Sequence, residues 1–143
     1  MRAHSNTIVV VDIYALIYRA YYAFPTLTDN SGNPTGAIFG TISLLCNVCA
    51  KYRAHQIVLA SDSYTPSFRK KLYPEYKSNR RAMPEDLVAQ ISQIREFLQK
   101  CGLTFIEKDG YEADDVIASL CSHFREHKIL IVSADKDLMQ LID

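Results

Sequence analysis

Three aspartates stand at or just after the ends of apolar runs that are typical of buried strands. Asp12 ends the segment IVVVD, Asp62 ends IVLASD and Asp135 ends ILIVSAD. Continuous apolar runs of this kind are typical of parallel strands that are covered on both faces. The carboxyl ends of parallel strands meet at one edge of a sheet, where open α/β folds bind ligands. We therefore expect these three carboxylates to lie close together in a binding site.

Four further acids are expected at the same edge. Glu112, Asp114 and Asp115 open a predicted helix, and Asp137 lies two residues beyond Asp135. Seven carboxylates in close quarters repel one another and would partly protonate unless divalent cations neutralised them. Such an oxygen-rich set suits Mg²⁺ or Mn²⁺. The alternative is that these acids only cap helices and form turns, as isolated acids in such positions often do.

The segment 63–83 has the opposite charge. Between Phe68 and Arg81 the chain holds six Lys or Arg residues and one Glu, although the formal net charge of the whole chain is zero. Phe68, Tyr73 and Tyr76 are interleaved with the basic residues. Basic groups pair with phosphates and aromatic rings stack on bases, so the segment is a candidate DNA-binding loop. A solvated surface loop with salt bridges is the alternative interpretation.

The elements that position these residues alternate between strand and helix. Hydrophobic periodicity predicts strands at 7–11, 56–60, 103–106 and 129–132, helices at 14–24, 37–52, 84–102 and 112–127, and a closing helix from Asp135. This order predicts an α/β fold in which a single domain over 1–143 forms a mainly parallel, twisted sheet with helices on both faces. Residues 63–83 do not fit the alternation, and a connection of this length is usually functional or mobile.

The composition excludes several functional classes. The chain has 143 residues, of which 48% are hydrophobic and 22% charged, as in an average folded domain. No apolar run approaches the roughly 20 residues of a membrane-spanning helix, so we expect no membrane partner and a cytoplasmic location. The sequence contains no nucleophile elbow and no phosphate-binding glycine-rich loop. A phospho-receiver domain is an alternative of similar size, but its paired acids follow the first strand, whereas here Asp135 and Asp137 follow the last.

Four segments resemble one known family in their order and spacing. They are PTGAIFG (34–40), FRKKLYPEYKSNRRAMP (68–84), GYEADDVIASL (110–120) and VSADKDLMQLID (132–143). Together they resemble the amino-terminal part of the 5′→3′ exonuclease domain of bacterial DNA polymerase I, in the flap-endonuclease superfamily. The resemblance implies a PIN-like fold. It also implies removal of 5′ ends and flaps from nicked or branched DNA, in replication and repair, by two-metal hydrolysis of phosphodiester bonds.

The resemblance implies roles for individual residues. The two expected metal ions, Mg²⁺ or Mn²⁺, would be held by Asp12, Asp62, Glu112, Asp114, Asp115, Asp135 and Asp137. The segment 63–83 would form the family's helical arch, in which Lys77 and Arg80 contact the scissile phosphate and Tyr76 lies near the bases. The other predicted DNA contacts are Arg19, Arg69, Lys70, Lys71 and Arg81.

Several features depart from the family pattern, and two of them bear on the metal site. Ile13 and Tyr14 follow Asp12 where the family usually has a small residue, so we expect them to crowd the rim of the site. The sequence also stops at Asp143, before the family's further metal-binding aspartates and its helix-three-turn-helix DNA clamp, which implies that the second metal is incompletely held. A DNA-binding fragment without catalytic activity, part of a longer DNA polymerase I chain, is therefore an alternative to an active nuclease.

Overall fold

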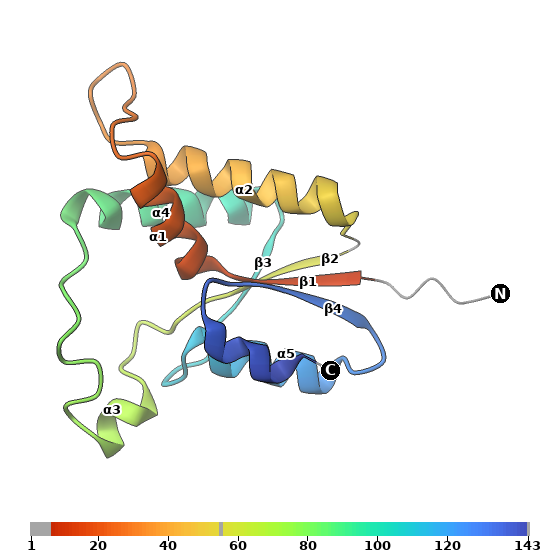
Figure 1. Ribbon diagram of the computed structural model, residues 1–143. Helices are drawn as coiled ribbons and strands as arrows, with labels where there is room; N and C mark the ends of the chain where they lie inside the picture. Colours follow the sequence, from red (N-terminus) through yellow and green to blue (C-terminus); the bar gives the residue numbers. More distant parts are fainter. Residues whose placement is uncertain (1–6, 55, 143) are drawn as a thin grey trace.

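The fold is built on four short strands. The computed structural model describes residues 7–54 and 56–142. The strands form one sheet in the order β3-β2-β1-β4, in which every neighbouring pair is parallel (Figure 1). Their bounds are β1 Thr7–Asp12, β2 Gln56–Ala60, β3 Thr104–Ile106 and β4 Lys128–Val132. The predicted α/β fold with a parallel sheet is confirmed.

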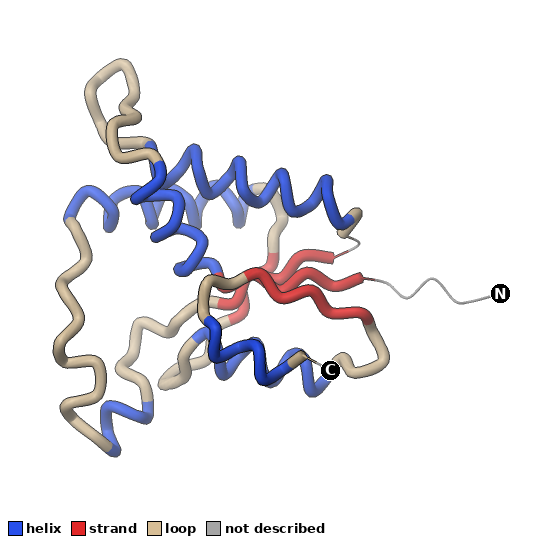
Figure 2. The backbone as a smooth tube through the Cα atoms, viewed as in Figure 1, coloured by secondary structure: helices blue, strands red, loops and turns tan. Residues whose placement is uncertain are grey.

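Helices connect the strands, as the alternation predicts. Between β1 and β2 lie α1 (Ile13–Ala23) and α2 (Gly36–Tyr52), α4 (Glu85–Lys100) precedes β3, and α5 (Ala113–His123) precedes β4. A short helix, α3 (Phe68–Leu72), lies in the basic segment, and the 3₁₀ helix η1 (Lys136–Leu141) follows β4. Figure 2 shows helices covering both faces of the sheet.

Alternate residues of the central strand face opposite layers. Val9 and Val11 of β1 pack in one core with residues of α1, α2 and α4, while Ile8 and Val10 pack in a second core with residues of α5 and η1. All four side chains are at most 4% exposed. Because successive side chains of a strand point to opposite faces, a continuous apolar run is what a doubly covered strand requires.

The strand order reverses at β1. The chain places β2 and β3 on one side of β1 and then returns to place β4 on the other side. In open α/β sheets, ligands bind in the crevice at such a switch point, beyond the carboxyl ends of the strands. The ends of β1 and β4 flank this crevice, so Asp12 and the residues that follow Val132 meet there.

Two glycines let α1 and α2 approach closely. A Cβ on Gly40 would lie 2.7 Å from the Cβ of Ala20 and 2.8 Å from the ring of Phe24. A Cβ on Gly36 would lie 1.9 Å from the carbonyl oxygen of Phe24. These three separations are far below the optimal distance between non-bonded atoms, so only glycine fits at these positions. The close packing fixes α1, whose first turn is capped by Asp12.

Two local expectations differ from the structure, while the closing helix expected from Asp135 is present as a 3₁₀ helix. The helix expected over 112–127 ends at His123, since the chain turns over residues 124–127 to enter β4. The segment 63–83 is helical only in α3, and residues 74–79 form turns because Pro74 lacks an amide donor and Ser and Asn favour turns.

In the described ranges, no helix combines the length and the apolar character needed to cross a membrane.

Candidate metal centre and nucleic-acid interface

Asp12 lies at the junction of β1 and α1. It is the last residue of β1 and the N-cap of α1, where one carboxylate oxygen accepts a hydrogen bond from the Ala15 amide at 3.3 Å. Its other oxygen accepts a hydrogen bond from the Ser133 hydroxyl at 2.9 Å. Ser133 follows β4, so this bond joins the ends of the two strands that flank the switch point.

Ser133 also orients Asp135. Its hydroxyl oxygen accepts a hydrogen bond from the Asp135 amide at 3.0 Å, and Asp135 caps η1 by accepting one from the Asp137 amide at 2.9 Å. Asp12, Asp135 and Asp137 are therefore held by one hydroxyl group and one short helix. Ser133 was not among the predicted site residues, and the signal that marks it is a polar residue between a buried strand and a functional acid.

Asp62 links the end of β2 to the first turn of α5. One of its carboxylate oxygens accepts a hydrogen bond from the Ala113 amide at 2.7 Å. Ala113 is the first residue of α5, so this bond brings Glu112 and Asp114 to the edge where β2 ends. The preceding Ser61 is fully buried, and its hydroxyl oxygen accepts a hydrogen bond from Arg95 at 3.1 Å. These contacts fix the position of Asp62.

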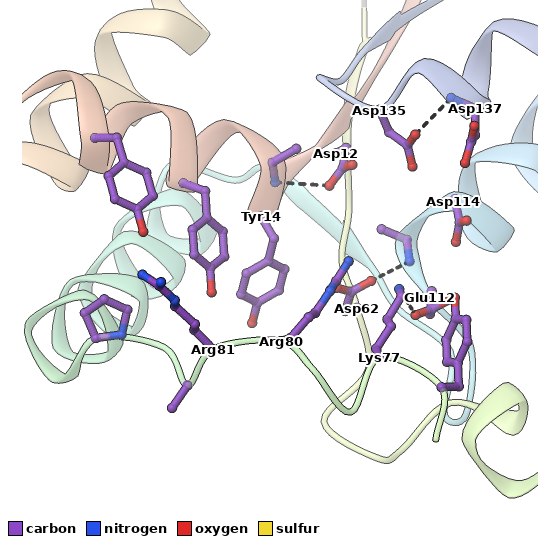
Figure 3. A pocket seen from close by; sticks show the side chains of 17 residues that line it. Asp12, Tyr14, Asp62, Lys77, Arg80, Arg81, Glu112, Asp114, Asp135 and Asp137 are labelled. Carbon is purple, nitrogen blue, oxygen red and sulfur yellow. Dashed lines mark hydrogen bonds and ion pairs between the residues drawn. The ribbon is translucent and has the colours of Figure 1, made fainter. Parts of the chain in front are cut away.

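The acids line one side of an open cleft of 740 Å³. Six of the seven predicted metal-site acids line it, and Figure 3 draws them on one side of the cleft: Asp12, Asp62, Glu112, Asp114, Asp135 and Asp137. Among the residues that the structure describes, Glu112 is the only one of these six that forms an ion pair with a basic side chain. Five carboxylates therefore share the cleft without a basic partner in the part of the chain that the structure describes.

Burial and mutual repulsion disfavour the charged forms of two of these acids. Burial raises the pKa of Asp12, and the nearby carboxylates of Asp62 and Asp135 raise it further. Burial also raises the pKa of Asp114, together with repulsion from the other two acids of its helical turn. A divalent cation would relieve both penalties, so this set of oxygen donors fits Mg²⁺ or Mn²⁺.

Arg69 pairs with two of the predicted metal ligands. Its guanidinium donates to both carboxylate oxygens of Asp115, at 2.6 and 2.7 Å, and to Glu112 at 2.9 Å. The hydrogen bonds from Arg69 lower the pKa of Asp115. Asp115 and Glu112 also form a capping box at the start of α5. Asp115 is the one predicted metal ligand that does not line the cleft.

The basic segment reaches Glu112 with two further side chains. The Lys77 ammonium group forms an ion pair with one Glu112 oxygen, and the Tyr76 hydroxyl donates to the other at 3.1 Å. Lys77 has a φ of 55°, in the left-handed region that non-glycine residues rarely occupy. Residues 63–83 are called the arch segment below. In Figure 3, the part of it that carries Lys77, Arg80 and Arg81 passes along one side of the cleft, and Lys77 and Arg80 point toward the acids.

The rest of the cleft wall is basic and aromatic. Arg80 and Arg81 line it, and neither forms an ion pair within the described ranges. Tyr14, which we expected to crowd the rim, lines the cleft together with Tyr18 and Tyr22 of the same helix. Ile13, which we also expected there, is buried in the core and does not line the cleft. The other predicted DNA contacts are exposed and lie outside the cleft: Arg19, Lys70 and Lys71.

Comparison with known proteins decides the family. The model of the family described as 5′-3′ exonuclease, N-terminal resolvase-like domain, matches residues 7–143. The chain belongs to this family. It is 42% identical over 141 residues to the 5′-3′ exonuclease of Buchnera aphidicola subsp. Acyrthosiphon pisum, covering 96% of this chain and 49% of that protein. It is 38% identical over 138 residues to DNA polymerase I of Caldicellulosiruptor bescii, covering 95% of this chain and 16% of that protein.

The exonuclease family assignment confirms the family predicted from the four sequence segments. It also excludes the phospho-receiver alternative. The chain spans at most about half the length of the curated relatives it matches. The solved structure of T5 5′-exonuclease with bound zinc ions has a TM-score of 0.68 and 23% identity, over 96% of this chain and 52% of that one. This likeness supports the PIN-like fold.

Proposed function

We propose that this chain is a nuclease domain that binds nicked, flapped or branched DNA at a 5′ end and hydrolyses its phosphodiester bonds with Mg²⁺ or Mn²⁺. The observation that supports this best is the cleft, where five carboxylates without a basic partner in the described ranges face a basic arch segment. The family supports the same reaction class, because relatives of this chain are named 5′-3′ exonuclease and DNA polymerase I.

Carboxylates from three strand ends and from the start of α5 would hold two divalent ions. The side chains best suited are the five without a basic partner among the described residues: Asp12, Asp62, Asp114, Asp135 and Asp137. Glu112 would join them once an ion displaces the Lys77 ammonium group. Bound ions would activate the attacking water and stabilise the leaving oxygen. Asp62 and Asp12 are held by hydrogen bonds from Ala113 and Ser133, so their carboxylates are oriented before any ion arrives.

The arch segment would hold the DNA backbone against these acids. Lys77 and Arg80 line the cleft, so they would contact the phosphate that is cleaved and stabilise the charge that develops on it. Tyr76 lies beside Lys77 and offers a ring face for a base. Arg81 would pair with a neighbouring phosphate. The exposed basic residues outside the cleft would extend the contact along the backbone: Arg19, Lys70 and Lys71.

A cleavage assay tests this proposal. The chain is incubated with a duplex that carries a labelled 5′ flap, once with Mg²⁺ and once with EDTA. We expect shortened products only with Mg²⁺, and none from Asp135→Asn. Asp109→Asn is the matched control, because Asp109 is exposed and lies outside the cleft. Metal-dependent cleavage by Asp135→Asn at the unmutated rate would refute the assignment.

A DNA-binding module without catalytic activity is the second candidate. The pairing of Arg69 and Lys77 with Glu112 favours it, because basic side chains already neutralise this acid. Under this alternative we expect salt-sensitive binding to the same flapped duplex and no product. In either case we propose that the protein acts in the cytoplasm, where its DNA substrate is. We also propose that it forms part of a longer DNA polymerase I or exonuclease chain.

A further inference from the structure

Asp115 has a different environment from the other predicted metal ligands. We propose that Asp115 is a positioning residue that acts through Arg69: it fixes Glu112 and the base of the arch segment, and it is not itself a metal ligand. Its role in cleavage rests on the proposed function, whereas its role in anchoring the arch segment does not. The distinction matters because Glu112, Asp114 and Asp115 place ligand atoms within 4.8 Å of one another, and by proximity alone all three qualify as a metal site.

The hydrogen bonds of Asp115 leave little room for an ion. The two terminal nitrogens of Arg69 each donate to one Asp115 oxygen, at 2.7 and 2.6 Å, and this bidentate pair is called the fork below. The Glu112 amide donates to one of the same oxygens at 3.0 Å. A carboxylate has about four lone-pair positions, and three are used here. Paired forks between arginine and carboxylate are among the strongest hydrogen-bonded ion pairs in proteins. An ion would have to displace this fork to reach Asp115.

The neighbouring Asp114 shows the contrast. It lines the cleft and forms no ion pair within the described ranges, and the hydrogen bond that its carboxylate accepts comes from the Asp115 amide at 3.0 Å. Consecutive residues of an α-helix are rotated by roughly 100° about its axis, since a turn takes 3.6 residues. The helix therefore points Asp114 into the cleft and Asp115 toward the arch segment, and the two acids have separate roles.

Arg69 transmits the position of Asp115 to Glu112. The Nη1 atom of Arg69 lies 2.7 Å from Asp115 Oδ2 and 2.9 Å from Glu112 Oε2, so one nitrogen bridges the two carboxylates. The Glu112 side chain is only 13% exposed, and the Lys77 ammonium group holds its other carboxylate oxygen. Tyr76 donates to the oxygen that Arg69 contacts, at 3.1 Å. Without Asp115, the guanidinium would lose its fork, and Glu112 would lose one of the three side chains that orient it.

The same pair anchors the base of the arch segment. Arg69 is the second residue of α3, and the preceding Phe68 donates its amide to the carbonyl oxygen of Gly110 at 2.7 Å. The Phe68 ring lies 5.3 Å from the ring of Tyr111, and the Arg69 guanidinium lies 4.7 Å from the centre of the Phe68 ring. The arch segment is thus tied to the start of α5 by a backbone bond, an aromatic contact and the Arg69–Asp115 fork.

Limited proteolysis of the metal-free chain tests the anchor without reference to catalysis. Trypsin cleaves after Lys77, Arg80 and Arg81, which are exposed in the arch segment. We expect faster cleavage there in Asp115→Asn and in Arg69→Gln, and no further increase in the double variant, because the two residues act as a unit. Arg69→Lys should behave like Arg69→Gln, since one ammonium group cannot form the fork. Unchanged trypsin cleavage of Asp115→Asn would refute the claim that the Arg69–Asp115 fork anchors the arch segment. Cleavage of Arg69→Lys as slow as that of the unmutated chain would refute it too.

Mn²⁺ titration followed by electron paramagnetic resonance tests whether Asp115 is a ligand. We expect Asp115→Asn to bind as many ions per chain as the unmutated protein, with affinity weakened by about tenfold, as is typical when a supporting residue is lost. Asp114→Asn should bind fewer ions. An equal loss of ions in both variants would refute the claim that Asp114 is a ligand and Asp115 is not. If the unmutated chain binds no Mn²⁺, the proposed function fails, and proteolysis alone tests whether Asp115 anchors the arch segment. If Asp115→Asn does not fold, Arg69→Gln provides the same comparison.

Discussion

Removing Lys77 should tighten the binding of divalent ions while slowing cleavage. The Lys77 ammonium group forms an ion pair with Glu112, which lines the same cleft as the five carboxylates without basic partners in the described part of the chain. An ion that uses Glu112 must first displace this ammonium group. Lys77→Met removes the competing charge and keeps much of the apolar stem of the side chain. We therefore expect a higher affinity for Mg²⁺ or Mn²⁺.

The size of the gain follows from the exposure of the pair. The Lys77 side chain is 33% exposed and that of Glu112 is 13% exposed, so solvent still screens the interaction in part. Ion pairs at such positions contribute about 0.2–1 kcal/mol. Since about 1.4 kcal/mol corresponds to a tenfold change in an equilibrium constant, Lys77→Met should bind the ion up to about fivefold more tightly.

Isothermal titration calorimetry at low ionic strength measures this change. Lys71→Met is the matched control, because Lys71 belongs to the same arch segment but is exposed and lies outside the cleft. The control removes the same charge from the chain and should leave the affinity nearly unchanged. Cleavage of a flapped duplex by Lys77→Met should fall at the same time, since the phosphate loses a contact. If Lys77→Met binds Mg²⁺ no more tightly than the unmutated chain, Lys77 does not compete with the ion for Glu112.

Three further predictions concern folding and DNA binding. Asp12→Asn should raise the free energy of unfolding of the metal-free chain, measured in urea at neutral pH, by about 0.5–2 kcal/mol, because burial raises the pKa of Asp12 and its charged form opposes folding. This gain should shrink as the pH falls through the raised pKa. It should vanish below pH 3.8, where the carboxyl group is protonated in the folded and the unfolded chain, and a gain independent of pH would contradict the prediction. Gly40→Ala should cost about 1–3 kcal/mol, because its Cβ would meet that of Ala20, and an unchanged unfolding midpoint would show that α1 and α2 can separate freely. Arg80→Ala should weaken binding to flapped DNA and reduce the slope of log affinity against log salt by about 1; an unchanged slope would mean that Arg80 contacts no phosphate.

The layered fold and the position of the acids followed from local patterns. Ile8 to Val11 is apolar at every position because both faces of β1 are covered, and this pattern separates a buried parallel strand from a strand with one exposed face. Once β1, β2 and β4 are parallel, Asp12, Asp62 and Asp135 must leave the sheet at the same edge. A single topological inference therefore brought together residues that are more than 120 positions apart.

The contacts that distinguish the acids did not follow from local patterns. The fork between Arg69 and Asp115 joins residues 46 positions apart, and it depends on the path of an arch segment that has no regular hydrophobic period. The role of Ser133 depends on the pairing of β4 with β1, because its hydroxyl group bridges Asp12 and Asp135. Such side-chain networks are set by the tertiary structure, whereas strands and helices are set largely by residue patterns.

A crystal of this chain soaked in Mn²⁺ and measured by anomalous diffraction tests the central claim most directly. That claim is that carboxylates from the ends of β1, β2 and β4 bind divalent ions together. The account predicts a manganese peak within about 2.0–2.3 Å of carboxylate oxygens from at least two of Asp12, Asp62 and Asp135, with Asp115 still paired to Arg69. Manganese peaks found only at isolated surface acids, with the cleft empty, would contradict it.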